Sequence, residues 1–246
     1  MPKTFDQAVC IRHWDWSETS QTVSLLARSH GLLRALAKGS RRPKAPFSGG
    51  LELLTLGRAG LIVKPATELA LLTEWDLQEI FPALRTSLRA HHAGLYFADL
   101  THHALVDRDP HPALFDALVT ALRGLAEPGS VATALLRYQW SVLVETGHRP
   151  VVGADAATGE PLRPAAVYRF RPELGGLVMP TGGSAPGWPV RAQTVAVLRG
   201  LEGGGPMEGP AESVDRANRL LASCLRYVLG REPRTMPLLF GNRLPR

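Results

Sequence analysis

Short apolar runs separated by turn-forming residues fill the first third of the chain. The runs occupy residues 7–14, 19–29, 32–39, 51–56, 61–63 and 69–75. We expect about five short strands in this segment, with Gly57 and Gly60 between two of them. Strands at this spacing predict a small barrel or sandwich, and five of them fit an OB-fold.

The second and third runs predict a hairpin. Residues 19–29 and 32–39 flank a turn signal, Ser29-His30-Gly31. Gly31 can adopt the positive φ that such a turn needs, so we predict that the two runs pair antiparallel. A helix through this region stays open as an alternative, because Leu and Ala favour helix.

From Pro82 onward, apolar residues recur at intervals of three and four, which indicates helices. The first starts at Pro82 and has a face made of Leu84, Leu88, His91, Leu95, Ala98, His102 and Leu105. The second carries Phe115, Leu118, Leu122 and Leu125. The third, capped by Ser130 and ending at Gly147, carries Val131, Leu135, Leu136, Trp140 and Leu143.

Further helices are predicted at residues 191–201 and 213–229. The core face of the last is Val214, Ala217, Leu221, Leu225 and Val228, with Arg216, Arg219 and Arg226 opposite.

Residues 148–190 are rich in Pro and Gly and hold isolated apolar runs only at residues 167–170 and 177–179. We expect an irregular, loop-rich insert there. The pattern as a whole predicts an α+β protein, with a barrel domain in residues 1–80 and a helical domain in residues 81–246 that contains the insert.

The charge of the chain points towards acidic partners. Its 246 residues carry a formal net charge of +6, with a pI of about 9.8. Residues 19–51 contain no Asp or Glu and six cations. An acid-free basic run beside Gly and Pro is typical of a loop that contacts a phosphate backbone, which makes nucleic acid the first candidate. The alternative is a solvated basic surface.

The candidate DNA contacts gather on the predicted hairpin. They are Lys38, Arg41, Arg42 and Lys44, with Arg34 beside them and Arg12 on the neighbouring strand. Gly39 and Pro43 are expected to hold the loop extended. Trp14 and Trp16 lie next to it and could stack on bases, although we expect at least one to be half-buried in the barrel.

Neither a metal nor a catalytic centre is indicated. His91-His92 and His102-His103 would lie roughly 16 Å apart on one helix, too far to share an ion, although Asp99 could pair with His103. Cys10 and Cys224 have no CxxC partner, and two lone thiols suit a reducing cytoplasm. No nucleophile elbow, phosphate loop, signal peptide or membrane span of roughly 20 apolar residues is found.

The order of motifs resembles the RecO family of bacterial recombination mediators. The most specific segment is the AKGxRR run at residues 37–42, which follows His30-Gly31. Weaker similarities cover nearly the whole chain: Glu18 with Thr22, Leu25 and Leu26; Tyr96-x-x-Asp99-Leu100; Pro112-x-Leu114-Phe115; residues 135–143 with Gly147 and Pro150; and Arg169-Phe170-Arg171-Pro172 with Gly175-Gly176.

This resemblance implies an N-terminal OB-fold, a helical domain and often a four-cysteine zinc module. It implies binding to single- and double-stranded DNA, strand annealing and, with RecR, assistance in loading RecA onto DNA coated by SSB. Whether RecF joins as a further partner stays open. The implied location is the bacterial cytoplasm, in association with the nucleoid. The acidic C-terminal tail of SSB would bind an apolar groove of the helical domain with basic rims, for which Arg123 and Arg137 are candidates.

The chain departs from the family at the cysteines. Asp155-Ala156-Ala157-Thr158-Gly159 stands where CxxCG is expected, and Met179 stands where another Cys is expected. We therefore expect no zinc and no other cofactor, and an insert held by packing.

The leading hypothesis is a DNA-binding mediator without catalytic chemistry, because annealing needs charge neutralisation and no nucleophile. The alternative from another class is a protein–protein adaptor for which DNA binding is minor, and salt-dependent DNA affinity separates the two. A hydrolase has no residue support.

Overall fold

The computed structural model describes residues 2–48, 51–64, 66–127, 129–180, 186–205, 209–241 and 244. The chain divides into two compact units, Met1–Pro128 and Gly129–Arg246. The domain boundary that the sequence predicts, between residues 80 and 81, falls inside the first unit. The division into a barrel domain and a helical domain at that boundary stays a prediction. Strands and helices are both abundant, so the α+β class is confirmed.

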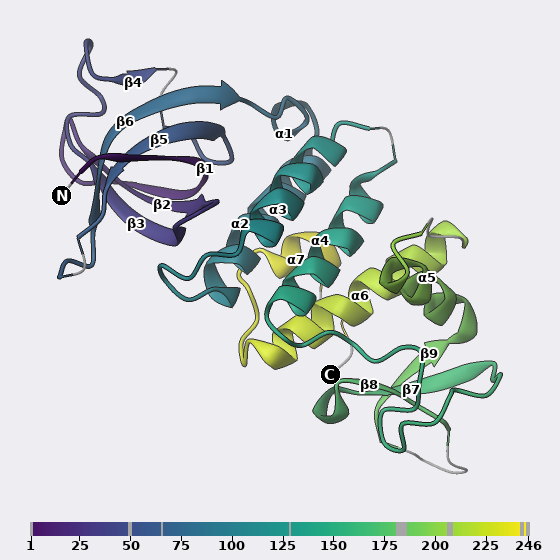
Figure 1. The fold of residues 1–246 in the computed structure, drawn as a ribbon. Helices are drawn as coiled ribbons and strands as arrows, with labels where there is room; N and C mark the ends of the chain where they lie inside the picture. The colour runs from purple at the N-terminus through teal and green to yellow at the C-terminus, as the bar shows by residue number, and fades with distance from the viewer. Residues whose placement is uncertain are drawn as a thin grey trace. The chain divides into compact units, whose positions relative to one another are not determined.

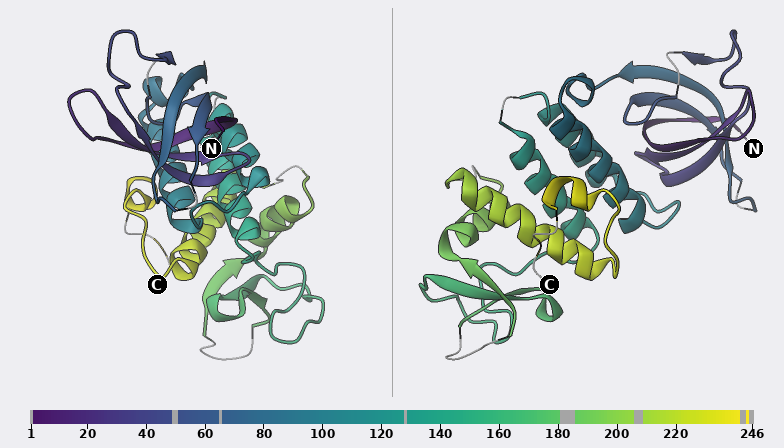
Figure 2. Two further views of the ribbon diagram at one scale, coloured as in Figure 1. Left: turned by 60° about the vertical axis from the view of Figure 1, so that its left-hand side comes forward. Right: turned by 180° about the vertical axis from the view of Figure 1, so that it is seen from behind.

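Six strands form one sheet in the described residues of the first unit (Figure 1). They are β1 (Thr4–Asp15), β2 (Gln21–Ala27), β3 (Gly31–Ala37), β4 (Phe47–Ser48), β5 (Leu56–Ile62) and β6 (Ala70–Glu79). Their order is β3-β2-β1-β5-β6-β4, and β3 also pairs in parallel with β6. That last pairing closes the five long strands into a barrel with OB-type connections, as predicted. Both views of Figure 2 show these strands curling around a common interior.

The hairpin is confirmed and its helical alternative is wrong. β2 and β3 pair antiparallel from Gln21 opposite Ala37 to Ala27 opposite Gly31. Gly31 has φ +70°, and a Cβ there would lie 2.1 Å from the backbone oxygen of Asp109. Glycine is therefore required twice over, by the turn and by the close approach of the segment that follows α2.

Residues 51–55 form no strand, and the run expected at residues 61–63 is the end of one longer strand, β5, rather than a strand of its own. Gly57 and Gly60, predicted to lie between two strands, are both inside β5. A Cβ on Gly57 would come within 2.5 Å of the Trp75 ring. The absence of a side chain at Gly57 thus lets the fully buried indole pack against the strand. A contact in the core, and not a turn, explains why glycine stands at this position.

The barrel interior is filled by apolar side chains from every long strand. Its buried members include Ala8, Cys10, Val23, Leu25, Leu33, Ala35, Ala59, Leu61, Leu72 and Trp75. Large and small residues are mixed, so that side chains from opposite walls can interdigitate at the density typical of protein cores.

The first unit also contains the helices α1 (Ala83–Thr86), α2 (Leu88–Ala104) and α3 (Pro112–Gly124). The single helix expected after Pro82 is interrupted at Ser87, whose hydroxyl accepts a hydrogen bond from the Ala90 backbone N–H at 3.3 Å and caps α2. The buried face predicted for this helix is also partly wrong. Leu88 is 71% exposed, whereas Gly94 faces inward against Leu84. Small residues on α2 permit this close packing.

The second unit combines helices with a small sheet. The helices are α4 (Val131–Glu145), α5 (Ala192–Glu202), α6 (Ala211–Val228) and α7 (Met236–Phe240). Gln139 on α4 donates a 2.8 Å hydrogen bond to Asn218 on α6, and both side chains are buried. A satisfied polar pair of this kind fixes how two helices pack. On α6, Ala217, Leu221 and Leu225 are buried as predicted.

The insert contains more regular structure than expected. β7 (Val167–Arg171), β8 (Gly176–Val178) and β9 (Trp188–Arg191) form an antiparallel sheet in the order β8-β7-β9, with a 3-10 turn, η1 (Pro172–Leu174), between β7 and β8. The expectation of a loop-rich insert holds for residues 148–166, which lack long strands and helices.

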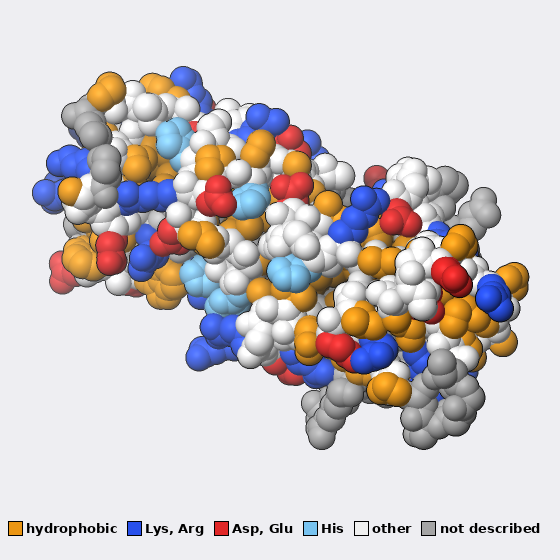
Figure 3. All heavy atoms as spheres, turned by 60° about the horizontal axis from the view of Figure 1, so that its bottom comes forward, with side chains coloured by type: hydrophobic (Ala, Val, Ile, Leu, Met, Phe, Trp, Pro, Cys, Tyr) orange, Lys and Arg blue, Asp and Glu red, His pale blue; other side chains and the backbone are white. Residues whose placement is uncertain are grey.

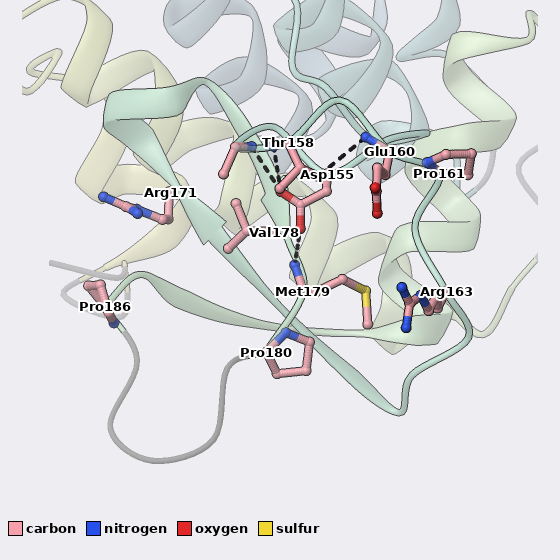
Figure 4. Close-up of a pocket in the computed structure, with 11 residues that line it drawn as sticks. Asp155, Thr158, Glu160, Pro161, Arg163, Arg171, Val178, Met179, Pro180 and Pro186 are labelled. Carbon is pink, nitrogen blue, oxygen red and sulfur yellow. Dashed lines mark hydrogen bonds between the residues drawn. The ribbon is translucent and has the colours of Figure 1, made fainter.

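Packing alone does not hold the insert, because the Asp155 carboxylate ties two of its segments together. One oxygen accepts hydrogen bonds from the backbone N–H groups of Ala157 at 2.8 Å and Thr158 at 3.3 Å. The other accepts from the Met179 N–H at 2.8 Å. Figure 4 shows this carboxylate in the wall of a pocket of about 460 Å³, directed at the Met179 backbone. Asp155 and Met179 stand at positions where the resemblance to the family leads us to expect cysteines, and a hydrogen bond from the Met179 backbone to the Asp155 carboxylate joins these two positions.

We expect Gly31→Ala to destabilise the barrel by about 3 kcal/mol, because it combines a strained φ with a backbone clash. Chemical denaturation followed by a barrel-specific signal measures the change. Gly39→Ala is the matched control. Its φ is +69°, but only the flexible side chain of Arg42 is near, so about 1 kcal/mol is expected. Equal losses in the two variants would show that the contact with Asp109 does not matter.

Asp155 predicts a pH dependence of the second unit. Its hydrogen bonds, first that from Met179, hold the pKa of the carboxyl below its ordinary value. The resulting stabilisation is therefore complete above the unfolded pKa of about 3.9 and is lost as pH falls through the folded pKa. We expect Asp155→Ala to lose roughly 2 to 3 kcal/mol at pH 7 and to flatten the acid limb of the stability curve. A variant with the wild-type acid limb would contradict this role.

Candidate nucleic-acid interface

The basic loop, defined as residues 38–46, leaves the end of β3 and is folded into turns. Gly39 adopts φ +69°, the Arg42 N–H donates to the Gly39 oxygen, and the Ala45 N–H donates to the Arg42 oxygen, each at 3.0 Å. The expectation of an extended loop is therefore wrong. Glycine in the left-handed region starts a succession of turns, which displays the side chains on a compact, hydrogen-bonded scaffold.

The basic loop is bonded to the tip of the β1–β2 hairpin. The Gly39 N–H donates to the Ser20 hydroxyl at 3.0 Å, and the Arg41 N–H donates to the Thr19 oxygen at 3.1 Å. The Ser40 hydroxyl donates to the Gln21 side chain at 3.1 Å. These contacts fix the position of the loop on the barrel.

Three of the six candidate cations are exposed and make no ion pair with any described residue: Lys38, Arg42 and Lys44. Arg42 folds back over Gly39, since a Cβ on that glycine would lie 3.4 Å from the Arg42 Cδ. Cations without a protein counterion are the ones free to exchange their solvent counterions for phosphate.

The other three candidates are paired with acids that lie outside the basic run. Arg41 pairs with Asp15. Arg34 pairs with Asp107 at 3.1 Å and with Glu68 at 3.7 Å. Arg12 pairs with Asp99 at 2.7 Å. The basic run contains no acidic residue, but acids from other parts of the chain lie next to some of its cations in the folded protein.

The pairing of Arg12 belongs to a small network on α2. Asp99 is buried and also lies 3.2 Å from His103, which confirms the helix-face pair expected there. The neighbouring His102 has its pKa lowered to about 4, first by burial and then by the positive charges of Arg12 and His103. Arg12 thus joins β1 to α2 within the first unit, and its guanidinium is only partly available to a ligand.

Basic and acidic side chains also alternate elsewhere. Figure 3 shows Lys and Arg interspersed with Asp and Glu on the face drawn, without a single continuous basic stripe. On α6 the arginines are paired: Arg216 with Glu212, Arg219 with Asp215 and Arg226 with Glu232. The basic loop is therefore better placed to bind an anion than the arginine-rich helix α6.

The two candidate partner-binding residues lie in different settings. Arg123, near the end of α3, makes a bidentate pair with Glu79 of β6, with its Nη2 2.6 Å from a carboxylate oxygen. This hydrogen bonding raises the pKa of Arg123. Arg137 is exposed on α4 in the second unit. That unit also contains a groove of about 460 Å³, lined by Leu143, His148, Arg149, Phe170, Leu174 and Tyr227 among others, and Arg137 does not line it.

No metal site is indicated among the described residues. The described parts of the chain contain no group of three His, Cys, Asp or Glu that could hold an ion. Cys10 and Cys224 are buried, and burial raises the pKa of the Cys10 thiol to about 12 and that of Cys224 further. Both oxygens of Asp155 are occupied by backbone donors, so the insert does not fit zinc.

Sequence reasoning missed the acids that neutralise the candidate cations. Asp15 lies one turn before the predicted hairpin and its proximity could have been suspected, since strands joined by a tight turn bring their ends together. Asp99 and Asp107 come from helix α2 and the segment after it. No pattern along the chain indicates that they meet the barrel strands.

Comparison with known proteins agrees with this architecture. The family model described as Recombination protein O N terminal matches residues 1–81, and the one described as Recombination protein O C terminal matches residues 85–237. No helix in the described ranges is long and apolar enough to cross a membrane.

Several relatives bear the name DNA repair protein RecO. The protein of Rhodopirellula baltica is 41% identical over 155 residues, which cover 61% of this chain and 57% of the relative. That of Anaeromyxobacter dehalogenans is 32% identical over 91% of this chain and 90% of its own. That of Dehalococcoides mccartyi is 28% identical over 97% and 95%. The barrel, the helices and these matches together show that the chain belongs to the RecO family of DNA repair proteins.

Proposed function

We propose that this chain is a recombination mediator that binds single- and double-stranded DNA through the basic loop and promotes annealing without catalytic chemistry. The observation that carries the proposal is the set of three exposed, unpaired cations on a structured loop at one end of the OB-type barrel. Membership of a DNA repair family supports the choice of DNA as the anion.

Annealing requires that two phosphate backbones approach one another. Cations that displace condensed counterions lower the repulsion between the strands, and this effect is independent of base sequence. A reaction of this kind needs no nucleophile or general base. Lys38, Arg42 and Lys44 can supply the charge because no acid within the described structure competes for them.

The three paired arginines are proposed to contribute less to DNA binding than the three unpaired cations. Arg34 and Arg41 form exposed pairs that phosphate can compete with, so they contribute weakly to binding. Arg12 is held by a buried carboxylate, and its removal would leave Asp99 without its partner. A loss of DNA binding in an Arg12 variant would therefore reflect a change in the barrel and α2 as much as a lost phosphate contact.

The proposed partners follow from family membership. We propose RecR as the partner with which RecA is loaded onto SSB-coated single strands, and whether RecF joins them stays open. The C-terminal tail of SSB is acidic and apolar, so an exposed cation such as Arg137 suits it better than Arg123, which Glu79 already neutralises. The proposed location is the bacterial cytoplasm, in association with the nucleoid.

A protein–protein adaptor is the second candidate function. The observation in its favour is the neutralisation of half of the candidate cations by acids of the same unit. An adaptor would bind DNA weakly, and mutation of the basic loop would leave its partner affinities unchanged.

Replacing Lys38, Arg42 and Lys44 together by Ala is expected to weaken binding to all DNA sequences alike. The slope of log affinity against log salt should fall in magnitude by about two on single strands, at about 0.7 for each phosphate contact. Fluorescence anisotropy with a labelled oligonucleotide at several salt concentrations measures both quantities.

A matched control is the variant Arg89→Ala, Arg231→Ala, Arg234→Ala. It removes three exposed cations outside the basic loop and changes the net charge equally. If both triple variants lose the same slope and affinity, the effect is one of overall charge, and the basic loop is not the DNA site.

For the SSB tail, we expect a synthetic tail peptide to bind at low salt and Arg137→Ala to weaken it several-fold, whereas Arg123→Ala has a smaller effect. Isothermal titration calorimetry with the full chain provides the affinities. Absence of any binding by the wild-type chain at low salt would rule out this partner.

A further inference from the structure

Two tryptophans stand exposed within three residues of each other at the end of β1. Trp14 is 47% exposed and Trp16 is 62% exposed. Trp75 and Trp140 are by contrast buried, at 1% and 8%. Both rings are exposed, so the expectation that at least one of them would be half-buried in the barrel is wrong. Large aromatic rings are normally the first side chains to be covered in a core, so two accessible indoles at one hairpin tip need a reason.

The backbone that carries these rings is ordered by its own hydrogen bonds. The Trp16 N–H donates to the Ser20 oxygen at 2.9 Å, and the Ser17 N–H donates to the same oxygen at 3.2 Å. On the strand side of the turn, Trp14 is opposite Thr22 and Asp15 is opposite Gln21. The rings are therefore presented by a short, structured turn, which reduces the conformational entropy lost on binding.

The same turn is bonded to the basic loop. Residues 19–21 accept hydrogen bonds from Gly39, Ser40 and Arg41, and the Arg41 guanidinium pairs with Asp15, directly between the two tryptophans in the sequence. The aromatic turn and the unpaired cations thus belong to two segments that are held side by side. A ligand that crosses from one segment to the other meets both aromatic faces and positive charge.

We propose that Trp16, flanked by Trp14, forms a stacking platform for unpaired bases and gives the basic loop a preference for single-stranded nucleic acid. Stacking on an indole requires an accessible base face. In a duplex both faces are covered by neighbouring base pairs, so the platform contributes only when the strand is single. The cations then follow the backbone of the same strand. This inference rests on the proposed function and deepens it, because it names the form of DNA that the site selects.

The combination of a ring and free cations is what favours nucleic acid over a protein partner. A purely apolar partner would leave Lys38, Arg42 and Lys44 without a counterpart, and a purely acidic one would leave the two indoles exposed. Single-stranded DNA or RNA offers phosphates and aromatic faces at regular intervals along one chain.

The test compares Trp16→Ala and Trp16→Phe with the wild-type full chain, on a single-stranded oligonucleotide and on the duplex of the same sequence. We expect Trp16→Ala to weaken single-strand binding about tenfold with little change on the duplex, because one stacking contact is lost. The salt slope should stay as in the wild type, and Trp16→Phe should keep most of the affinity. Trp14→Ala is expected to show a smaller effect of the same kind.

Several outcomes separate this inference from the proposed function. Equal losses on single strands and duplex, or no loss on either, overturn the platform. If the Lys38, Arg42 and Lys44 triple variant still loses its salt slope in that case, DNA binding by the loop stands without the platform. A wild-type chain that binds neither form overturns both. A thermal midpoint unchanged from the wild type shows that the variants keep the overall fold.

Discussion

The parallel pairing of β3 with β6 is the contact on which the barrel and its proposed function both depend. Three residue pairs form it, from Ala35 opposite Ala70 to Ala37 opposite Leu72. It converts an open sheet into a closed barrel, and it ends where the basic loop begins. The loop therefore starts from a strand that is hydrogen-bonded on both sides, and its first residues have a defined direction.

Charge pairing determines which region of this surface is available to an anion. The barrel and the helices of the first unit supply acids to Arg12, Arg34 and Arg41, and also to Arg28, which Asp116 holds through two hydrogen bonds. The exposed pairs of Arg28, Arg34 and Arg41 contribute little to stability, unlike that of Arg12 with the buried Asp99. The larger effect of the pairing is to neutralise cations that look the same as the unpaired ones in the sequence. The surface available to an anion is therefore less positive than the net charge of the chain indicates.

Local patterns predicted the elements whose causes lie within a few residues. The hairpin at Gly31, the second and third helices and the core face of α6 follow from turn chemistry and periodicity. The failures have causes that are distant in the sequence. Gly57 resembles a turn residue in the sequence because Trp75, which packs against it, lies eighteen positions away. The face of α2 that is buried includes Gly94, which packs against Leu84, whereas Leu88 is exposed.

The candidate site was predictable as a segment but not as a set of contacts. Its residue types and the absence of local acids were visible, and the AKGxRR run pointed to the family. The partners of its arginines were not visible, because Asp99 and Asp107 come from other elements. The same limit applied to Asp155, whose bond to Met179 joins segments 24 residues apart. The missing cysteines indicated what the insert lacks and gave no sign of what replaces it.

DNA is proposed to contact the basic loop and the aromatic turn beside it. Hydrogen–deuterium exchange of the full chain, with and without a single-stranded oligonucleotide, tests it most directly. We expect slower exchange in residues 16–20 and 38–46, with little change along α6. Protection confined to α6 or to the remaining arginines of the C-terminal segment, with the loop unchanged, would contradict it.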